Sequence, residues 1–495
     1  MIYLHTFLFT LYPILFYFSN NLNEVFVKSI FFPMFLSLTF GILVYLTIYL
    51  LIKQKQNAPI LTSVFLILFF SYGHIVNIFT KSFKKINNIE VPYNTIFLFM
   101  WFMIFAILAF ISRKKSYDST NKLFNIISSI LIILVIFNIF KNPKIIKWSD
   151  EIKTSTKKTT KTSKNYPDIY FIVPDRYARN DVLKKYYKFD NSEFTNYLQE
   201  KGFFYADNSI SNYPTTTMSL GSELNMKYIN YFTNEYGTKQ SDFKPVVKIL
   251  RNNEVGYILK EKGYTYINMG SWWCLTQKFN DADYNFNSKA LVNDEFTVRF
   301  LETTIFSELS NYILPEKYRL NFRNEQKNIA LYQIEKLKEV INMQSPKFVF
   351  VHLLIPHNPY VFDKNCNYVN EKITKSQKEI KNYLDQLQCK NKLLKVMVDD
   401  ILKNSKKDPI VIVQSDEGPH PITSPLPKDN YWKAASTIAL EEKFKILNML
   451  YFPRINYSTL STNMSPINTF RFIFNNYMDE NFEYQDAKTY LFEDQ

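Results

Sequence analysis

Three segments that lie far apart in the sequence each end an apolar run with side chains that can bind a metal or move a proton. "DIYFIVPD" ends in Asp175, "FVFVHLLIPH" carries His352 and ends in His357, and "IVIVQSDE" ends in the pair Asp416–Glu417. Carboxylate oxygens and imidazole nitrogens are the donors that divalent cations take in proteins. An aspartate after a strand is also a common turn residue. Three such ends in one chain nevertheless favour a shared metal site.

A candidate nucleophile lies in "SNYPTTTMSLGSELNM", residues 211–226. Thr215, Thr216 and Thr217 follow a proline and precede a stretch that resembles the start of a helix. A hydroxyl at that place faces the positive end of the helix and its free N–H groups. It becomes a nucleophile only where a base or a metal lowers its pKa. A threonine-rich capping turn is the alternative interpretation of this segment.

These residues need a sheet to bring them together, and the second part of the chain has the pattern of one. Short apolar runs, typical of strands covered on both faces, alternate with stretches of helix length. The runs are "DIYFIVPD", "YTYINMG", "PKFVFVHLL" and "DPIVIVQSD". Strands separated by helices predict an α/β domain with a mainly parallel sheet. Sites in such sheets form outside the carboxyl ends of the strands, where the polar residues above are found.

The first 140 residues are dominated by Phe, Leu, Ile and Tyr. Crossing a hydrocarbon layer of roughly 30 Å takes about 20 helical residues, and five stretches are apolar enough to do so. They lie near 2–18, 29–52, 59–80, 94–112 and 123–140. The first lacks the basic start and small-residue cleavage site of a signal peptide, so we expect an uncleaved helix.

The sequence thus predicts a transmembrane domain over 1–140, a polar linker over 141–166 and an extracytoplasmic catalytic domain over 167–495. Basic residues mark the loops after the second and fourth stretches as cytoplasmic, and the carboxyl-terminal part as external. These residues are Lys53, Lys55, Arg113, Lys114, Lys115 and Lys122. Three lysines of the third loop, Lys81, Lys84 and Lys85, argue for the opposite orientation. We expect a multi-pass protein of the cell membrane.

The net charge of +14 comes from lysines scattered among Asn, Ile, Phe and Tyr. No zinc finger or aromatic-basic stacking motif accompanies them, so we expect no nucleic-acid partner. A basic external domain beside anionic lipid is the simpler explanation. Of the three cysteines, Cys366 and Cys389 flank one segment and could form a disulfide outside the cytoplasm, leaving Cys274 over. Three reduced thiols are the alternative.

Taken together, these segments resemble the alkaline phosphatase/sulfatase superfamily. More narrowly, they resemble its membrane-anchored branch, which includes lipoteichoic acid synthases and lipid A phosphoethanolamine transferases. The resemblance covers nearly the whole chain, from the five apolar stretches to the α/β domain. It implies that Asp175 of "VPDRY" is the first metal ligand. It also implies that Thr216, three residues before Ser219, is the nucleophile, with its two neighbouring threonines as rivals, and that His357 of "PHNPY" binds the transferred phosphate.

The chain departs from the family pattern at the last metal ligands, which are usually a consecutive Asp-His followed by Gly. Here Asp416–Glu417 precedes Gly418, and His420 is the nearest imidazole that could reach in instead. The implied metal ligands are Asp175, Thr216, Asp416 and Glu417. Glutamate in place of histidine replaces a nitrogen ligand with a hard, charged oxygen ligand. A site of oxygen ligands suits Mn²⁺ or Mg²⁺ better than Zn²⁺.

The resemblance implies a metal-dependent transferase that moves a phosphoglycerol-type or phosphoethanolamine-type group through a phosphothreonine at Thr216. The donor would be a membrane lipid and the acceptor a glycan or lipid of the cell envelope. The C/S-x-P-x-R motif that sulfate-ester hydrolysis requires is absent around "TTTMSL". A phosphodiesterase or other sulfatase-like hydrolase of the same fold is the first alternative. A catalytically degenerate, membrane-anchored binding protein is the second, and Glu417 is its best support.

Overall fold

The structure is a computed structural model of the 495-residue chain. It describes residues 4–22, 25, 27–52, 54–82, 85–86, 89–90, 93–112, 118–141, 166–236, 243–287, 295–314, 322–370, 373–374, 377–426, 432 and 434–491. The predicted linker 141–166 falls outside these ranges except at its two ends, as do most of the loop lysines and arginines that orient the apolar stretches.

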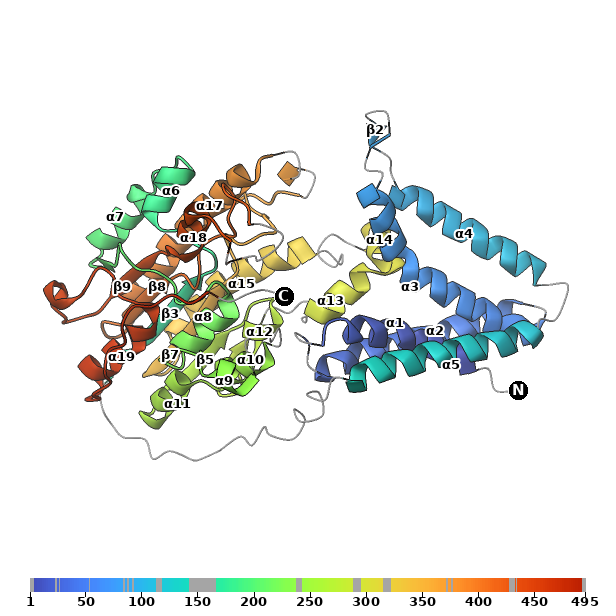
Figure 1. Cartoon of the computed structure of the whole chain (residues 1–495), viewed down its shortest axis with the longest axis horizontal. Helices are drawn as coiled ribbons and strands as arrows, with labels where there is room; N and C mark the ends of the chain where they lie inside the picture. Colours follow the sequence, from blue (N-terminus) through green and yellow to red (C-terminus); the bar gives the residue numbers. More distant parts are fainter. Residues whose placement is uncertain are drawn as a thin grey trace. The chain divides into compact units, whose positions relative to one another are not determined.

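The chain divides into two compact units (Figure 1). The first comprises Met1–Lys153 together with Ala290–Phe322, and the second comprises Thr154–Lys289 together with Arg323–Gln495. The chain therefore enters the second unit, returns to the first for one insertion, and goes back. The insertion has no counterpart in the domain division predicted from the sequence, whose boundaries stay a prediction.

Five apolar helices form most of the first unit and match the five predicted stretches. They are α1 (Leu4–Ser19), α2 (Phe31–Leu51), α3 (Ala58–Ser82), α4 (Tyr93–Ile111) and α5 (Asp118–Lys141). Four helical segments are long and apolar enough to cross a membrane: Phe31–Leu51, Lys55–Phe79, Tyr93–Ile111 and Asp118–Lys141. The first helix has 16 residues, which span only about 24 Å at 1.5 Å per residue.

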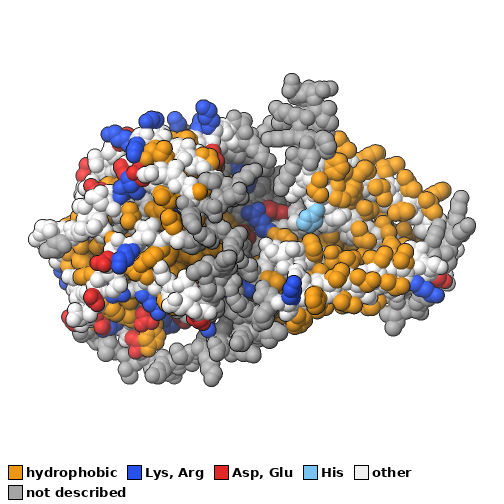
Figure 2. Space-filling model, viewed as in Figure 1, with side chains coloured by type: hydrophobic (Ala, Val, Ile, Leu, Met, Phe, Trp, Pro, Cys, Tyr) orange, Lys and Arg blue, Asp and Glu red, His pale blue; other side chains and the backbone are white. Residues whose placement is uncertain are grey.

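The surface of these helices is suited to lipid. Figure 2 shows hydrophobic side chains lying almost side by side over this unit, whereas charged side chains of both signs are spread over the second. On α4, for example, Phe99 and Phe102 are 67% and 68% exposed. Exposed aromatic side chains in such numbers are costly in water and ordinary in a bilayer. The first unit therefore has the composition of a membrane anchor.

The second unit is built on a seven-stranded sheet with the order β4-β9-β8-β3-β7-β5-β6. Its strands are β3 (Ile169–Pro174), β4 (Phe204–Tyr205), β5 (Thr265–Met269), β6 (Tyr284–Phe286), β7 (Lys347–Leu353), β8 (Ile410–Gln414) and β9 (Asn448–Tyr451). The five strands from β8 to β6 pair in parallel, and β9 pairs antiparallel to both β8 and β4. The α/β class, the mainly parallel sheet and the four predicted strands are confirmed.

Helices cover both faces of the sheet (Figure 1). One face packs on α6 (Asn180–Tyr186), α7 (Ser192–Glu200), α15 (Phe322–Ile341) and α17 (Glu379–Asn404). The other packs on α8 (Thr216–Glu223), α10 (Lys244–Arg251), α11 (Glu254–Glu261) and α19 (Pro466–Tyr477). Other helices among the described residues of this unit are α9 (Phe232–Tyr236), α12 (Cys274–Gln277), α18 (Thr437–Phe444) and the 3-10 helix η5 (Tyr457–Thr459). Strands buried on both sides explain the continuous apolar runs in the sequence.

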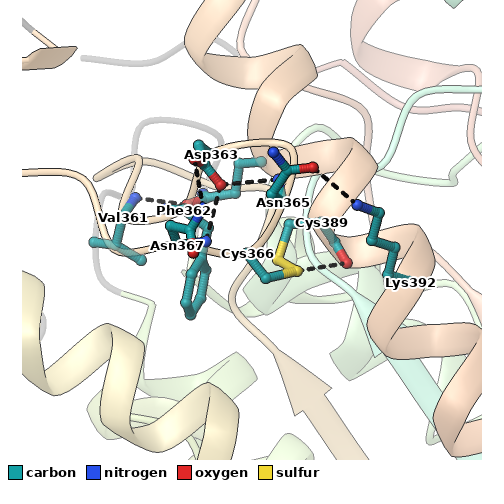
Figure 3. The surroundings of a disulfide bond; sticks show 9 residues. Val361, Phe362, Asp363, Asn365, Cys366, Asn367, Cys389 and Lys392 are labelled. Carbon is teal, nitrogen blue, oxygen red and sulfur yellow. Dashed lines mark hydrogen bonds between the residues drawn. A yellow bond between two sulfur atoms is a disulfide. The ribbon is translucent and has the colours of Figure 1, made fainter.

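A disulfide joins Cys366, in the loop after β7, to Cys389 on α17 (Figure 3). The loop turns beside it, where the Asp363 carboxylate accepts hydrogen bonds from the backbone N–H groups of Asn365 and Asn367. The bond is the predicted pairing, and Cys274 at the start of α12 takes no part in it. The disulfide secures the segment that carries His357 to the helix that follows it.

Candidate metal centre and active site

The register of the parallel strands sets two predicted ligands side by side. Ile172 of β3 pairs with Val413 of β8, so Asp175 and Asp416 each lie three residues beyond a paired position. The backbone N–H of Asp175 donates to the carbonyl oxygen of Leu353 at the end of β7, which keeps the chain in register past the strand. Both carboxylates are buried, with exposed fractions of 2% and 1%. Parallel pairing thus assembles residues that are 241 positions apart in sequence.

The third member of the cluster is His352, which the predicted site does not include. Ligand atoms of Asp175, His352 and Asp416 lie within 4.8 Å of one another, and all three residues are buried. Among the described residues, Oδ1 of Asp175, Oδ2 of Asp416 and Nε2 of His352 are buried without any hydrogen-bond partner. Buried polar atoms normally have partners. Two carboxylate oxygens and one imidazole nitrogen, all unpaired and close together, fit a divalent cation.

His352 is held so that Nε2 is available for a ligand. Its Nδ1 lies 2.9 Å from the hydroxyl oxygen of Thr276 on α12, which in turn lies 2.8 Å from the hydroxyl of Ser271. His352 lies on the same face of β7 as Phe350 and Phe348, which pack on the side of the sheet that α8 covers. The sequence signal was one polar residue near the end of an otherwise apolar strand. The family resemblance of the "PHNPY" motif favours His357 as the functional histidine of this segment, whereas the cluster contains His352.

Thr216 reaches the same cluster from the first turn of α8. Burial raises the pKa of the Asp416 carboxyl, and a hydrogen bond from the Thr216 side chain is the largest effect that lowers it. The Thr216 hydroxyl therefore lies against a carboxylate of the cluster. The neighbouring threonines differ: Thr215 is the N-cap residue and its hydroxyl oxygen has no described partner, while Thr217 is 5% exposed. The contact with Asp416 favours Thr216 among the three candidates.

Glu417 stands apart from the cluster and is paired with two cations. Its Oε1 lies 2.8 Å from Nζ of Lys443 and 3.1 Å from Nε of Arg176, and the side chains of Glu417 and Lys443 are 2% and 3% exposed. Gly418 makes this possible, because a Cβ there would lie 2.0 Å from the carbonyl oxygen of Glu442. The other carboxylate oxygen of Glu417, Oε2, is buried without a described hydrogen-bond partner. The glycine thus brings the loop against the end of α18, where Lys443 lies.

The charges of the site favour a bound cation. Burial raises the pKa of Asp175 well above its usual value, and the Asp416 carboxylate raises it further. Burial likewise raises the pKa of Glu417, against the lowering effects of Lys443 and Arg176. Burial lowers the pKa of His352 to about 3, so its imidazole is neutral at pH 7. Carboxylates that repel each other beside a neutral imidazole are stabilised when a metal ion supplies positive charge.

A cavity of about 160 Å³ is lined by residues that include Arg176, His357 and His420. Nδ1 of His357 contacts the carbonyl oxygen of Asn358, so Nδ1 carries the proton and Nε2 is the acceptor nitrogen. Burial lowers the pKa of His357 well below its usual value, and the charge of Arg176 lowers it further. His420 is exposed and lines this cavity rather than joining the cluster. Arg176 supplies a guanidinium on the wall of this cavity, a group that can bind phosphate oxygens.

One further buried titratable group, a lysine, lies in the electrostatic reach of the cluster. Lys390 on α17 is 0% exposed, and its Nζ has no hydrogen-bond partner among the described residues. Burial lowers the pKa of Lys390 well below its usual value, against the raising effect of the Asp175 carboxylate. It lies in a helix whose sequence predicts only an amphipathic packing face. Nothing in the local pattern distinguishes this lysine from the others of α17.

The comparisons with known proteins bear on the same domain. Residues 167–475, well over half of the chain, match the family model described as Sulfatase. The chain belongs to the sulfatase family. The superfamily resemblance is therefore confirmed, and this sulfatase-family chain is a sulfatase-like hydrolase or transferase. No curated protein matches it in sequence.

Solved structures similar to this sulfatase-family chain include two periplasmic domains of EptC proteins and one protein described as a putative sulfatase. The periplasmic domain of EptC from Escherichia coli has a TM-score of 0.40 at 14% identity, covering 64% of this chain and 84% of that one. The periplasmic domain of phosphoethanolamine transferase EptC from Campylobacter jejuni has a TM-score of 0.38 at 14% identity, covering 64% and 92%. The putative sulfatase yidJ from Bacteroides fragilis has a TM-score of 0.37 at 14% identity, covering 65% and 76%.

Proposed function

We propose that this sulfatase-family protein is a metal-dependent, membrane-bound transferase that moves a phospho-group from a lipid to a cell-envelope acceptor through Thr216. One observation carries the proposal: the Thr216 side chain is hydrogen-bonded to Asp416 beside the buried Asp175–His352–Asp416 cluster. A hydroxyl at the start of a helix, next to a divalent-cation site, is the arrangement that activates a threonine as a nucleophile.

Asp175, His352 and Asp416 would hold the metal, with Thr216 beside them. Oε2 of Glu417 would be a further candidate ligand. When bound, the cation lowers the pKa of the threonine hydroxyl and neutralises charge on the phosphoryl oxygens. The donor set differs from the one expected from sequence, because His352 supplies an imidazole. Two carboxylates with one imidazole suit Mn²⁺ or Zn²⁺ better than Mg²⁺, which favours oxygen ligands and retains water.

The chain's own residues support a two-step transfer. Oγ1 of Thr216 loses its proton and forms a bond to the phosphorus of a phosphodiester, while the bond from phosphorus to the lipid oxygen breaks and the leaving lipid alkoxide takes up a proton to become the alcohol. The oxygen of an acceptor hydroxyl then bonds to the phosphorus and loses its proton, while the bond to Oγ1 breaks and Oγ1 regains a proton. The neutral His357, with Nε2 free to accept, is suited to take the proton of the acceptor hydroxyl. Arg176 on the cavity wall is suited to bind the phosphoryl oxygens.

A lipid donor fits the first unit. A soluble enzyme would need no apolar anchor, whereas four helices of this chain are long and apolar enough to cross a membrane. A phospholipid held in that membrane presents its head-group phosphodiester at the surface. The acceptor would be an alcohol of an envelope glycan or lipid. The phosphoglycerol and phosphoethanolamine types of group remain equal candidates.

The family match favours hydrolysis as a second candidate, because sulfatases use water as the acceptor. We would incubate the full chain with vesicles containing a labelled phospholipid and Mn²⁺ or Zn²⁺, with and without an acceptor alcohol. The transferase proposal predicts a phospho-alcohol product that increases with acceptor concentration. A phosphomonoester that forms at the same rate at every acceptor concentration identifies a hydrolase.

Matched variants separate both activities from a degenerate site. Thr216→Ala should abolish turnover, whereas Thr215→Ala and Thr217→Ala should retain most of it. Metal content measured on each variant shows whether the loss is chemical or structural. If the wild-type chain shows no turnover and binds no metal, the catalytically degenerate, membrane-anchored binding protein becomes the better interpretation.

A further inference from the structure

Helices α13 (Glu295–Glu302) and α14 (Ile305–Ile313) lie in the catalytic half of the sequence but belong to the first unit. They lie between β6 and α15, two elements of the catalytic domain, in the insertion Ala290–Phe322. The described residues of the insertion pack with the apolar helices of the first unit (Figure 1). The catalytic domain is thus joined to the first unit by the linker and also by both ends of this helical pair.

Aromatic side chains of α13 are buried among the apolar helices. Phe296 and Phe300 are 5% and 2% exposed, and both belong to a core cluster formed mainly by α1 and α3. The ring centroids of Phe296 and Tyr17 are 5.2 Å apart, and those of Phe300 and Phe70 are 5.8 Å apart. Two large apolar side chains buried in this way give α13 a packed interface with α1 and α3.

Polar contacts fix the position of the pair on α3 and α4. The backbone N–H of Gly73, within α3, donates to the carbonyl oxygen of Thr303 over 2.9 Å. A Cβ at position 73 would lie 2.6 Å from that oxygen, so a glycine is required for this approach. The Asn94 side chain on α4 donates to Oε2 of Glu308 on α14 over 2.8 Å. A backbone hydrogen bond made in the middle of an apolar helix marks a specific docking position.

We propose that the α13–α14 pair is a second membrane anchor of the catalytic domain, which binds the apolar helices of its own chain independently of the linker. The partner is the surface formed by α1, α3 and the start of α4. At the far end of the pair, Tyr312 and Ile313 are 66% and 63% exposed, as expected of side chains that meet lipid at the membrane interface. An anchor of this kind ties the catalytic domain to the membrane at two sites along the chain.

The test uses the full chain with an amino-terminal affinity tag and a protease site within residues 150–160. After cleavage in mild detergent, only non-covalent contacts join the tagged apolar helices to the catalytic fragment. We expect the two fragments of the wild-type chain to co-elute from the affinity resin. Gly73→Leu and the double variant Phe296→Ser/Phe300→Ser should each reduce the co-eluted fragment by tenfold or more.

Two controls make the result specific to the interface. Gly73→Leu changes only the apolar helices, so release in that variant cannot come from a misfolded catalytic fragment. His74→Leu places the same side chain at the neighbouring exposed position and should leave co-elution unchanged. Separation of the wild-type fragments after cleavage would overturn the proposal. Co-elution that persists in Gly73→Leu and in the phenylalanine double variant would also overturn it. Neither result depends on catalytic turnover.

Discussion

The Nδ1 atom of His352 lies 2.9 Å from the hydroxyl of Thr276, while Nε2 of the same ring is buried without a described partner near Asp175 and Asp416. The hydroxyl sets the orientation of the ring, and the unpaired nitrogen completes a set of three donors. A histidine held on one nitrogen and open on the other is the usual arrangement of a metal ligand. The imidazole missing at position 417 is thus available from a different strand.

His352→Ala should therefore weaken metal binding strongly. Removing a ligand costs more than removing the group that orients it, so we expect an affinity loss above roughly 100-fold. Calorimetric titration of the metal-free chain with Mn²⁺ and with Zn²⁺ measures it. Unchanged affinity for both ions would show that His352 is a buried structural histidine.

Thr276→Val keeps the side-chain shape and removes the hydroxyl that contacts His352. We expect metal affinity to fall by roughly 10–100-fold, as is usual when the partner of a metal-binding histidine is lost. Thermal unfolding of the metal-free variant should change little by comparison. Equal affinity in variant and wild type would mean that the ring is oriented by its packing alone.

Lys443→Met should destabilise the fold, because it leaves the Glu417 carboxylate buried with only Arg176 as a partner. Breaking one side of a buried ion pair costs about 3–5 kcal/mol. The double variant Glu417→Gln/Lys443→Met should recover most of that loss. Denaturant or thermal unfolding in detergent checks both. A double variant no more stable than Lys443→Met would show that the lysine acts through other contacts.

Asp175→Asn should stabilise the metal-free chain near neutral pH while abolishing metal binding. Burial holds the pKa of Asp175 well above the value of about 4 that it has in an unfolded chain. A carboxyl of that kind favours the folded state at low pH, and the contribution is lost as pH rises from about 4 through the folded pKa. The advantage of the variant should therefore grow over that range, by about 1.4 kcal/mol for each pKa unit. Thermal unfolding in chelator from pH 4 to 8 tests this; a variant less stable than wild type at every pH would contradict it.

The sequence predicts the parts of this protein that local pattern controls. Apolar runs identify the four long strands, and the rule for the carboxyl ends of parallel strands brings Asp175 and Asp416 together. The strands β4, β6 and β9 have two to four residues, too few for a periodic pattern. The two cysteines that flank one segment pair as their placement suggests.

Other features depend on tertiary contacts. Lys443 reaches Glu417 from a helix 26 residues further on, through a turn that only Gly418 allows. In the sequence, His352 is one polar residue within an apolar strand. Its role depends on Thr276 and on Asp175 and Asp416, which follow two other strands. The α13–α14 pair is too short to be recognised as a membrane element, and its burial depends on the surface of α1 and α3.

The most direct test of the central claim is the mass of the peptide that carries Thr216, after the full chain meets a phospholipid donor without an acceptor. We expect a phospho-group on Thr216 when Mn²⁺ or Zn²⁺ is present and no modification in chelator. The Thr216→Ala variant should carry no modification on this peptide. Addition of an acceptor alcohol should remove the group. Continued turnover with Thr216 unmodified, or modification at Thr217 instead, would contradict the account.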